Sequence, residues 1–382
     1  MAPPMAISVI RRDSPNLVEQ HGRQWRGVLE QYGYFYMGDT GHPGTLRVPS
    51  WRPSRVVAVD PQGNPSIWEN ACRHHGPQLV PAYDSLEYQL WNGKIKCPWH
   101  AMEYGPQGEV RTPGLARIRL TDLPEQHCPT KEILVWQGLV FELGQQPSAR
   151  AELEESLNYV SRVAGEVFDF REYRLRKSVR APQVLPNGET ADAFTSTDNY
   201  TDVTHVPRHA GNLAQLVDFS SAAYTYFPKE GEPEKAAVQF MKPHRDWRMT
   251  QFGQHYSDCG MPEPPCGAAW VTTRMGLMLE YYPGVIVVSQ CFPHPEKWWE
   301  CTFYHDFYYH RLASDRFIDC HQDIFDQTGQ EDLLWCSGAT RHIRNLIEQG
   351  QGDRPWGFFD PRAENLGPWY SREVRQFLMN LR

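Results

Sequence analysis

The chain has 382 residues, long enough for two or three domains and a large apolar core, so its fold needs no disulfide or metal to hold it together. The net charge of −8, with 38 basic residues scattered along the chain, argues against a nucleic-acid partner, which requires a basic stripe. We expect no membrane span, which would need about 20 apolar residues, and no secretory signal at the N-terminus.

Cysteine usage indicates a reducing compartment. The nine cysteines have no regular spacing, which predicts free thiols and a cytoplasmic protein. We expect most of them to be small buried side chains. Cys72 and Cys97 are the exceptions, because each lies close to a histidine in a short motif.

The first part of the chain, from Trp25 to about Gly144, is a succession of short strand-like runs separated by turns. The runs are 55–60, 61–70, 86–97 and 132–143. Within them, PQGN (61–64) and WNGK (91–94) predict hairpin turns, the second because Asn-Gly tolerates positive φ at both turn positions. This part is therefore predicted to be a small all-β domain, which ends where residues 144–156 become polar and helix-forming.

The second part mixes longer strands with one long helix. Strand candidates are 236–243, 276–283, 284–292 and 298–310, and the most apolar stretch, 276–293, predicts two buried strands around a turn. Apolar residues at mostly helical intervals predict a helix over about 313–349, with a break at Gly329. Strands followed by a late long helix indicate an α+β fold.

Two short motifs contain four candidate metal ligands. Cys72-x-His74 is followed 25 residues later by Cys97-x-x-His100, so each cysteine precedes its histidine. A structural zinc site is one interpretation, but its usual spacing pairs cysteine with cysteine and histidine with histidine. In a Rieske [2Fe–2S] centre two thiolates hold one iron and two imidazoles hold the other, so each loop must supply one of each. The alternating order favours the cluster, and His75 is surplus to it.

These motifs, in CRHHG and CPWHAMEYGPQGEV, resemble the two cluster-binding loops of Rieske domains. The similarity includes the glycine after the first loop, the tryptophan before His100 and the Tyr-Gly-x-x-Gly after it. It implies that Cys72, His74, Cys97 and His100 bind a [2Fe–2S] cluster. The chain differs from the family in two respects: His75 stands where many members have arginine, and the 22 residues between His74 and Cys97 exceed the usual gap, which we attribute to a longer hairpin.

A second constellation follows in residues 197–213, as Asp202-x-x-His205-x-x-x-His209. Histidines four residues apart lie on one helical face or on one side of a bent turn, and they leave room for a third ligand from elsewhere. Two histidines and one carboxylate form the facial triad of non-haem Fe(II) oxygenases. Taken alone the string is weak, and two surface histidines are the alternative.

In a chain with Rieske motifs, this segment, with Asn199 and Tyr200 just ahead, resembles the iron-binding segment of Rieske non-haem iron oxygenase catalytic subunits. The resemblance implies that His205 and His209 bind a mononuclear Fe(II). Family members more often have four residues between these histidines, whereas this chain has three, with Pro207 among them. Pro207 favours a break or a new helix start.

The resemblance also implies the third iron ligand and the roles of two further residues. Asp332, in GQEDLLW (329–335), corresponds to the family's carboxylate ligand, whereas Glu331 would point about 100° away on a helix. A solvated acidic helix face is the alternative for this segment. Asp202 is implied to hold His205 and to reach the His100 imidazole of a neighbouring subunit, and Asn199 is implied to lie in the catalytic site. This bridge implies a ring-shaped oligomer, in its simplest form a homotrimer.

The resemblance implies the ring-hydroxylating oxygenase family and an α+β fold, in which an all-β Rieske domain precedes a catalytic domain with an antiparallel sheet covered by helices. We place an N-terminal arm at 1–24, the Rieske [2Fe–2S] domain at 25–150 and the mononuclear iron domain at 151–382. The sequence has no flavin or nicotinamide motif, so a separate NAD(P)H-dependent reductase, with or without a ferredoxin, must deliver electrons.

The expected reaction uses O₂ to hydroxylate or oxidatively demethylate a small organic substrate. We expect the substrate pocket to draw on the aromatic strands between Met275 and His310. A monooxygenase is favoured over an aromatic-ring cis-dihydroxylating dioxygenase. An electron-transfer or scaffold protein with a vestigial second site is an alternative of a different class.

Overall fold

The structure is a computed structural model that describes residues 10–81, 89–90, 95–115, 119–202, 205–209, 212–218, 224–227, 234–359 and 366–379. The chain divides into two compact units. The larger unit comprises Met1–Leu29, Glu154–Tyr173 and Arg180–Arg382, and the smaller unit comprises Glu30–Leu153 and Arg174–Val179. Among the described residues, no helix is both long enough and apolar enough to cross a membrane. The domain borders expected after residues 24 and 150 stay predictions.

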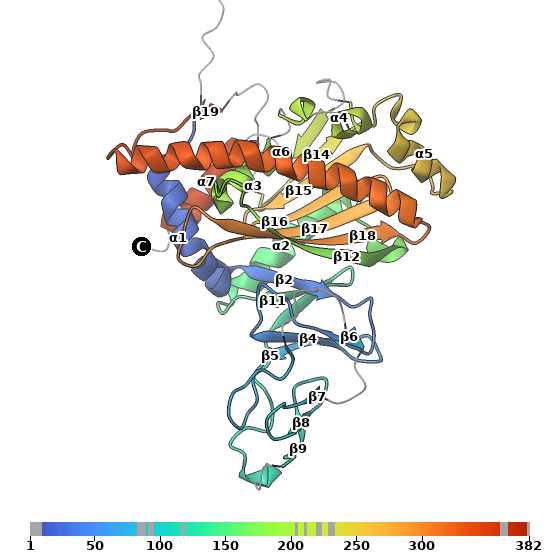
Figure 1. Ribbon diagram of the computed structural model, residues 1–382, viewed down its shortest axis with the longest axis vertical. Helices are drawn as coiled ribbons and strands as arrows, with labels where there is room; N and C mark the ends of the chain where they lie inside the picture. Colours follow the sequence, from blue (N-terminus) through green and yellow to red (C-terminus); the bar gives the residue numbers. More distant parts are fainter. Residues whose placement is uncertain are drawn as a thin grey trace, which may run out of the picture. The chain divides into compact units, whose positions relative to one another are not determined.

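The smaller unit consists mainly of short antiparallel strands in three small sheets, with orders β10-β11-β2, β5-β4-β3-β6 and β7-β8-β9 (Figure 1). This confirms the all-β domain expected from the sequence. The strands are β2 (Tyr34–Asp39), β3 (Thr45–Arg47), β4 (Arg55–Val59), β5 (Pro65–Glu69), β6 (Gln89–Leu90), β7 (Ile95–Lys96), β8 (Glu103–Tyr104), β9 (Val110–Thr112), β10 (Ile133–Trp136) and β11 (Leu139–Leu143).

The hairpin predicted at PQGN joins β4 to β5. The Asp60 carboxylate accepts hydrogen bonds from the backbone N–H groups of Gln62 and Asn64, and Gly63 has a φ of 87°. A left-handed φ of this kind favours glycine, so the turn residues account for the hairpin. The WNGK turn lies outside the described residues. On either side of it, β6 (Gln89–Leu90) pairs with β3 and β7 (Ile95–Lys96) pairs with β8.

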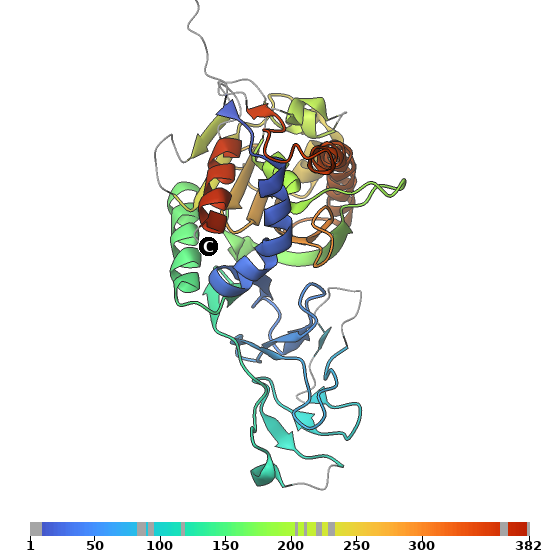
Figure 2. The same cartoon turned by 90° about the vertical axis from the view of Figure 1, so that its left-hand side faces the viewer.

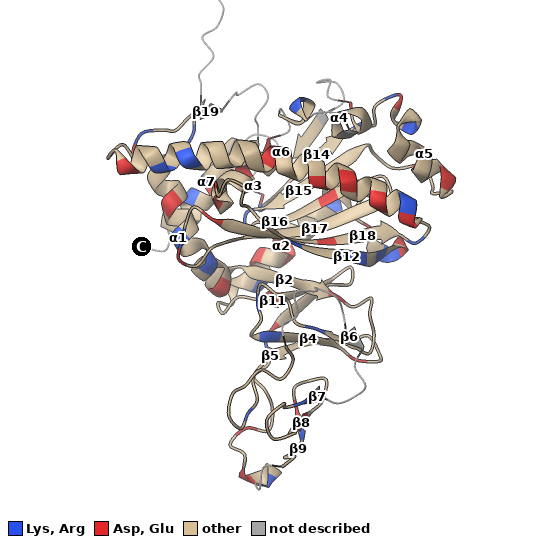
Figure 3. Cartoon of the chain, in the orientation of Figure 1, with Lys and Arg blue, Asp and Glu red and all other residues tan. Residues whose placement is uncertain are grey.

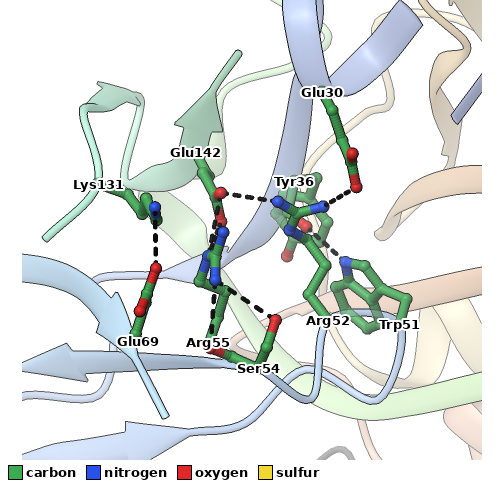
Figure 4. Close-up of polar contacts among 9 residues, drawn as sticks. All are labelled: Glu30, Tyr36, Trp51, Arg52, Ser54, Arg55, Glu69, Lys131 and Glu142. Atoms are coloured by element: carbon green, nitrogen blue, oxygen red, sulfur yellow. Dashed lines mark hydrogen bonds and ion pairs between the residues drawn. The ribbon is translucent and has the colours of Figure 1, made fainter. Parts of the chain in front are cut away.

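A buried ion-pair network joins sheet strands of the smaller unit (Figure 4). Glu142 of β11 accepts hydrogen bonds from Arg52, at 2.8 Å, and from Arg55 of β4, at 3.1 Å from each carboxylate oxygen. Arg52 also lies 3.4 Å from Glu30. Two arginines around one buried carboxylate satisfy its charge, which fixes β4 against β11. The indole N–H of Trp51 donates to the Tyr36 carbonyl beside this network.

A seven-stranded sheet has the order β12-β18-β17-β16-β15-β14-β13, and the larger unit contains all of it except Arg174–Val179 of β12. From β18 to β13 every neighbouring pair is antiparallel. The apolar stretch 276–293 forms β16 and β17 around a Pro283-Gly284 turn, and both strands are buried throughout, as predicted. The strands are β12 (Tyr173–Pro182), β13 (Tyr224–Phe227), β14 (Ala236–Met241), β15 (Ala268–Thr273), β16 (Leu277–Tyr282), β17 (Val285–Pro293) and β18 (Cys301–His310).

Helix α6 (Asp315–Glu348) runs across this sheet, and Figure 2 shows it nearly end-on beside α3 (Ala193–Thr201). It begins at Ser314, whose hydroxyl accepts the N–H of Phe317. The break predicted at Gly329 is wrong, because the helix is continuous there. A single glycine costs a helix only about 1 kcal/mol, and the packing of residues such as Phe317 and Ile343 on both sides of Gly329 outweighs that cost.

The N-terminal part of the chain contains a helix where short strand-like runs were expected. Helix α1 (Pro15–Tyr32) replaces the predicted strand-like start at Trp25. Val18, Trp25, Val28 and Leu29 are buried at the spacing of one helical face, a pattern that outweighs their β-propensity. The remaining elements are β1 (Ile10–Arg11), α2 (Ser148–Ala164), α4 (Asn212–Leu216), α5 (Gln251–Asp258), β19 (Phe358–Phe359), α7 (Leu366–Met379) and short 3-10 turns at Leu120–Asp122, Phe170–Glu172, Val206–Arg208 and Trp247–Met249.

Candidate metal centres

The first Cys-x-His motif lies on a tight loop that begins at Cys72. The N–H of Cys72 donates to the carbonyl of Pro77, and its carbonyl accepts the N–H of Gly76, both at 2.9 Å. Gly76 has a φ of 83°, a conformation that glycine adopts without strain. The two hydrogen bonds close the loop around Arg73, His74 and His75.

The second motif repeats this backbone arrangement. The N–H of Cys97 donates to the carbonyl of Met102, at 2.8 Å, and its carbonyl accepts the N–H of Ala101, at 3.0 Å. Ala101, four residues after the cysteine like Gly76, also has a positive φ, of 54°. Gly114 packs against this loop so closely that a Cβ atom would lie 2.3 Å from the His100 carbonyl oxygen. The two motifs therefore present their side chains from matching loops, a likeness that the residue letters do not reveal.

The two thiols lie together in the core of the smaller unit. Cys72 and Cys97 are both buried, and the Tyr104 hydroxyl donates a hydrogen bond to Cys72 Sγ at 3.1 Å. Burial raises the pKa of Cys72, but the hydrogen bonds from Tyr104 and the backbone of His74 more than offset it, so the net pKa is lowered. The environment of Cys72 therefore favours the thiolate that a metal requires, whereas burial and the neighbouring Cys72 raise the pKa of Cys97.

The imidazoles form a second group beside the thiols. The ring centroids of His74 and His100 lie 4.8 Å apart, and the Nδ1 of His74 is buried with no hydrogen-bond partner among the described residues. His75 lies in the same group, with its ring 4.0 Å from that of His74 and 4.8 Å from that of the exposed Trp99. The donor set of two thiols and two imidazoles fits a [2Fe–2S] cluster. Proximity alone does not separate His75 from the ligands, so its exclusion stays a prediction.

The second constellation is carried by a single turn of 3-10 helix, Val206–Arg208. His205 precedes the turn and His209 follows it, and Pro207 occupies one of its first positions, where no backbone N–H is needed. The histidines therefore flank a bent turn, and Pro207, where a break or a new helix start was expected, helps to form it. Their ring centroids lie 5.4 Å apart.

Helix α6 brings Asp332 to these histidines. The Nε2 atoms of His205 and His209 lie 3.3 Å and 3.4 Å from the same Asp332 oxygen, Oδ1. The ligand atoms of the three residues all lie within 4.8 Å of one another. Two imidazoles and a carboxylate at this separation fit a mononuclear metal such as Fe(II).

The acidic face of α6 is separate from this site. Asp315, Asp319, Asp323 and Asp326 are exposed, whereas Asp332 is partly buried. Figure 3 shows the acidic residues along α6 in red. The alternative of a solvated acidic face thus describes the first turns of the helix and not Asp332.

Three further side chains orient the histidines and Asp332. Asn199 of α3 donates to Asp332 Oδ1 at 3.0 Å. Asp202, the residue after α3, lies 3.6 Å from Nδ1 of His205. Glu331 lies 2.7 Å from Nδ1 of His209. Each histidine thus directs Nε2 to Asp332 and Nδ1 toward a second carboxylate. The contact of Glu331 is a hydrogen bond and fixes the tautomer of His209. Asp202 lies beyond hydrogen-bond distance, and Nδ1 of His205 has no hydrogen-bond partner among the described residues. The contact of Glu331 was not foreseen from the sequence.

The electrostatics of the site favour a cation between the three residues. Burial lowers the pKa of His205, but the carboxylates of Asp202 and Asp332 outweigh it and raise the pKa to about 9. For Asp332, burial raises the pKa, yet the two histidines hold it well below its usual range. A site that holds a proton this tightly on imidazole beside an ionised carboxylate also stabilises a bound metal ion.

Comparison with known families identifies the smaller part of the chain. The model of the Rieske [2Fe-2S] domain matches residues 40–122, which include both Cys/His loops. A putrescine 2-hydroxylase from Bordetella bronchiseptica is 25% identical over 305 residues, which cover 73% of this chain and 62% of that protein. The match thus spans less than two thirds of that relative's length.

Solved structures share the whole fold. A quaternary ammonium Rieske monooxygenase, described with carnitine oxidation and inter-subunit electron transfer, matches with a TM-score of 0.70 at 12% identity, over 97% of this chain and 96% of that one. Naphthalene 1,2-dioxygenase from Rhodococcus sp., bound to indole, matches with a TM-score of 0.64 at 15% identity, over 95% and 91% of the two chains. These likenesses establish an all-β domain followed by helices and a large antiparallel sheet.

Proposed function

We propose that the chain is the alpha subunit of a Rieske non-haem iron oxygenase, a monooxygenase that hydroxylates or oxidatively demethylates a small organic substrate. Its Rieske [2Fe–2S] domain and its likeness in fold to such subunits support this proposal. The observation that carries the proposal is the convergence of His205, His209 and Asp332 within 4.8 Å, in a chain that also has a Rieske domain. A protein that only carries electrons has no need of the second group.

Each metal group has its own set of residues in this proposal. Cys72, His74, Cys97 and His100 would hold the [2Fe–2S] cluster, and His205, His209 and Asp332 would hold Fe(II). When bound, the cluster supplies electrons one at a time and the mononuclear iron supplies the means to activate O₂.

The chain's own polar residues keep the iron ligands in place. Asp202 and Glu331 would fix the two imidazoles through Nδ1, and the Asn199 amide would hold the Asp332 carboxylate in one orientation. These contacts keep three ligands on one side of the site, which leaves the other side for substrate and O₂.

Electron delivery in this proposal needs partners. A separate NAD(P)H-dependent reductase, with or without a ferredoxin, would reduce the cluster. Asp202 would connect His205 with His100 of a neighbouring copy in a homotrimer. The related quaternary ammonium monooxygenase, for which inter-subunit electron transfer is described, supports this arrangement. The reduced cysteines support a cytoplasmic setting.

The choice of monooxygenase over dioxygenase rests on the relatives. The hydroxylase of putrescine and the quaternary ammonium monooxygenase favour one-oxygen chemistry, whereas the naphthalene dioxygenase keeps ring dihydroxylation as the second candidate.

The test is turnover of the metal-loaded protein with a generic reductase, NADH and ¹⁸O₂ on a panel of aliphatic amines, quaternary ammonium compounds and aromatic hydrocarbons. One labelled oxygen per product supports the monooxygenase, and two on adjacent ring carbons support the dioxygenase. A cluster that the reductase reduces, with no labelled product from any compound and no O₂ uptake, would contradict oxygenation.

A further inference from the structure

A buried carboxylate without a cationic partner lies in the centre of the large sheet. Glu280 of β16 is only 6% exposed and lies opposite Trp270 of β15 and Val287 of β17 in the strand register. Among the described residues, no lysine, arginine or histidine forms an ion pair with it. An isolated buried carboxylate is costly, so its presence on this strand requires an explanation.

A short hydrogen-bond chain holds Glu280 as an acceptor. The indole N–H of Trp270 donates to the Tyr282 hydroxyl at 3.2 Å, and that hydroxyl donates to Glu280 Oε2, also at 3.2 Å. Because Trp270 fills an acceptor position of the Tyr282 oxygen, the Tyr282 proton is directed at the carboxylate. Tyr282 is the one hydrogen-bond donor to Glu280 within the described ranges, which leaves Oε1 for another donor.

Glu280 lies on the sheet face that α3 and α6 cover, the helices that supply the candidate iron site. The hydroxyl of Tyr200, the residue after Asn199, donates to the backbone carbonyl of Leu279 at 3.0 Å. The ring of Tyr282 lies 5.8 Å from that of His321 on α6. Burial raises the pKa of Glu280 to about 8, and the nearby charge of Asp332 adds to this shift. The carboxylate is therefore within electrostatic reach of the candidate iron ligand.

The same face carries a second unsatisfied polar atom. Thr272 lies two residues from Trp270 on β15, so the two side chains project from one side of the sheet. Its hydroxyl oxygen is buried and has no hydrogen-bond partner in the described part of the chain. Buried polar atoms without partners are rare in folded proteins. The Thr272 hydroxyl and Oε1 of Glu280 are thus two polar groups on one face with room for a further hydrogen bond.

We infer that Glu280 binds the protonated amino group of the substrate, so that the oxygenase acts on a primary or secondary alkylamine. This inference rests on the proposed function and names the substrate class of that site. An ammonium group supplies a cationic partner for the Glu280 carboxylate and N–H donors for its Oε1 atom. Trp270, Tyr282 and Tyr200 provide the aromatic surroundings that favour a cation.

The chemistry also separates amines from quaternary ammonium compounds. A quaternary nitrogen has no N–H, so it would leave the second oxygen of Glu280 buried without a hydrogen bond. With a pKa of about 8 the unliganded Glu280 carboxyl is largely protonated at neutral pH. An ammonium group would ionise it and form an ion pair, whereas a neutral alcohol could donate one hydrogen bond but would not stabilise the charged form. Glu280 therefore discriminates by both charge and hydrogen bonding.

The experiment compares three probes of one chain length, n-butylamine, n-butanol and butyltrimethylammonium. Binding is measured by calorimetry on the metal-loaded protein without reductase, and turnover is measured separately with reductase and O₂. The variant Glu280→Gln keeps the side-chain size and an acceptor for Tyr282 but removes the charge. Glu280→Asp keeps the charge on a shorter side chain. The matched control is Glu373→Gln, a partly buried glutamate of the same unit that pairs with Arg274.

We expect n-butylamine to bind the wild type at least about 10-fold more tightly than either other probe, as a charged hydrogen bond predicts. The affinity of Glu280→Gln for n-butylamine should be at least about 10-fold weaker than that of the wild type, and its affinity for n-butanol should change by less than about 3-fold. The affinity of Glu280→Asp for n-butylamine should lie between the two, and that of Glu373→Gln should equal that of the wild type. If Glu280→Gln does not fold, the weaker binding of Glu280→Asp and the probe preference of the wild type carry the test.

Three results would overturn the inference: equal affinity of Glu280→Gln and wild type for n-butylamine, equal affinity of the wild type for amine and quaternary probe, or no binding of any probe. The inference and the proposed function fail in different ways. Glu280-dependent amine binding without oxygenated product refutes the oxygenase and leaves the ammonium site standing. Oxygenation of n-butanol without amine binding refutes the ammonium site and leaves the oxygenase standing.

Discussion

Nδ1 of His209 lies 2.7 Å from a carboxylate oxygen of Glu331, the residue directly before the candidate iron ligand Asp332. Neighbouring residues on a helix diverge by about 100°, and on that basis Glu331 was expected to point away from the site. His209 lies between the two side chains, with Nε2 facing Asp332 and Nδ1 facing Glu331. Two adjacent carboxylates therefore act on opposite nitrogens of one ring.

Glu331→Gln should weaken iron binding without abolishing it. The amide removes the charge that stabilises the His209 tautomer, and the loss of such an outer partner typically costs about 10- to 100-fold in metal affinity or activity. The measurement is retained iron after dialysis against graded chelator. Glu348→Gln, an exposed change at the end of the same helix, is the matched control. Wild-type iron retention in Glu331→Gln would show that the contact has no role in binding.

Asp202→Ala should leave both metal groups bound and slow electron delivery to the catalytic iron by about 10-fold or more. Asp202 lies beside Nδ1 of His205 and is proposed to reach His100 of a neighbouring subunit. The rate of cluster reoxidation in a single turnover with O₂ and substrate measures this step. Loss of the cluster spectrum in the variant would contradict the bridging role.

Tyr104→Phe should lower the reduction potential of the cluster. The Tyr104 hydroxyl donates to Cys72 Sγ, and a hydrogen bond to a ligand sulfur stabilises the reduced, more negative state. We expect a drop on the order of 50 mV, equivalent to about 1 kcal/mol for one electron. Redox titration followed by EPR spectroscopy gives the value. An unchanged or higher potential at full cluster content would refute this assignment.

His74 and His75 form a natural pair for testing the ligand assignment. His74→Ala should abolish the characteristic Rieske EPR signal, whereas His75→Ala should keep it at nearly full intensity. The two residues are adjacent and their rings lie 4.0 Å apart, so each variant controls for disturbance of the loop by the other. Loss of the signal in His75→Ala together with its survival in His74→Ala would reverse the assignment.

The sequence alone predicted the features that depend on local pattern. The motif spacing indicated the Cys/His group, and the resemblance to Rieske oxygenases indicated His205, His209 and Asp332. The PQGN turn predicted the β4/β5 hairpin, and the apolar run at 276–293 predicted two buried strands. Each of these depends on residues close together in the chain, where periodicity and turn chemistry are informative.

The sequence could not predict features that depend on packing or on distant contacts. Helix α1 forms because one face of it is buried, and α6 continues through Gly329 because it has buried residues on both sides of that glycine. The contact of Glu331 with His209 joins residues 122 positions apart. In the sequence, Glu280 is an acidic residue within an apolar stretch. Only the strand register opposite Trp270 and the hydrogen bond from Tyr282 show that it is a buried carboxylate with an aromatic and a hydroxyl neighbour.

The central claim is that this chain binds iron at two separate sites, of which the second is catalytic. Iron and acid-labile sulfide analysis of the reconstituted protein tests it most directly, with His205→Ala measured in parallel. We predict three iron and two sulfide per chain for the wild type, and two of each for His205→Ala with an intact Rieske EPR signal and no oxygenation. Two iron per wild-type chain, with no further loss in His205→Ala, would contradict the claim and indicate an electron carrier.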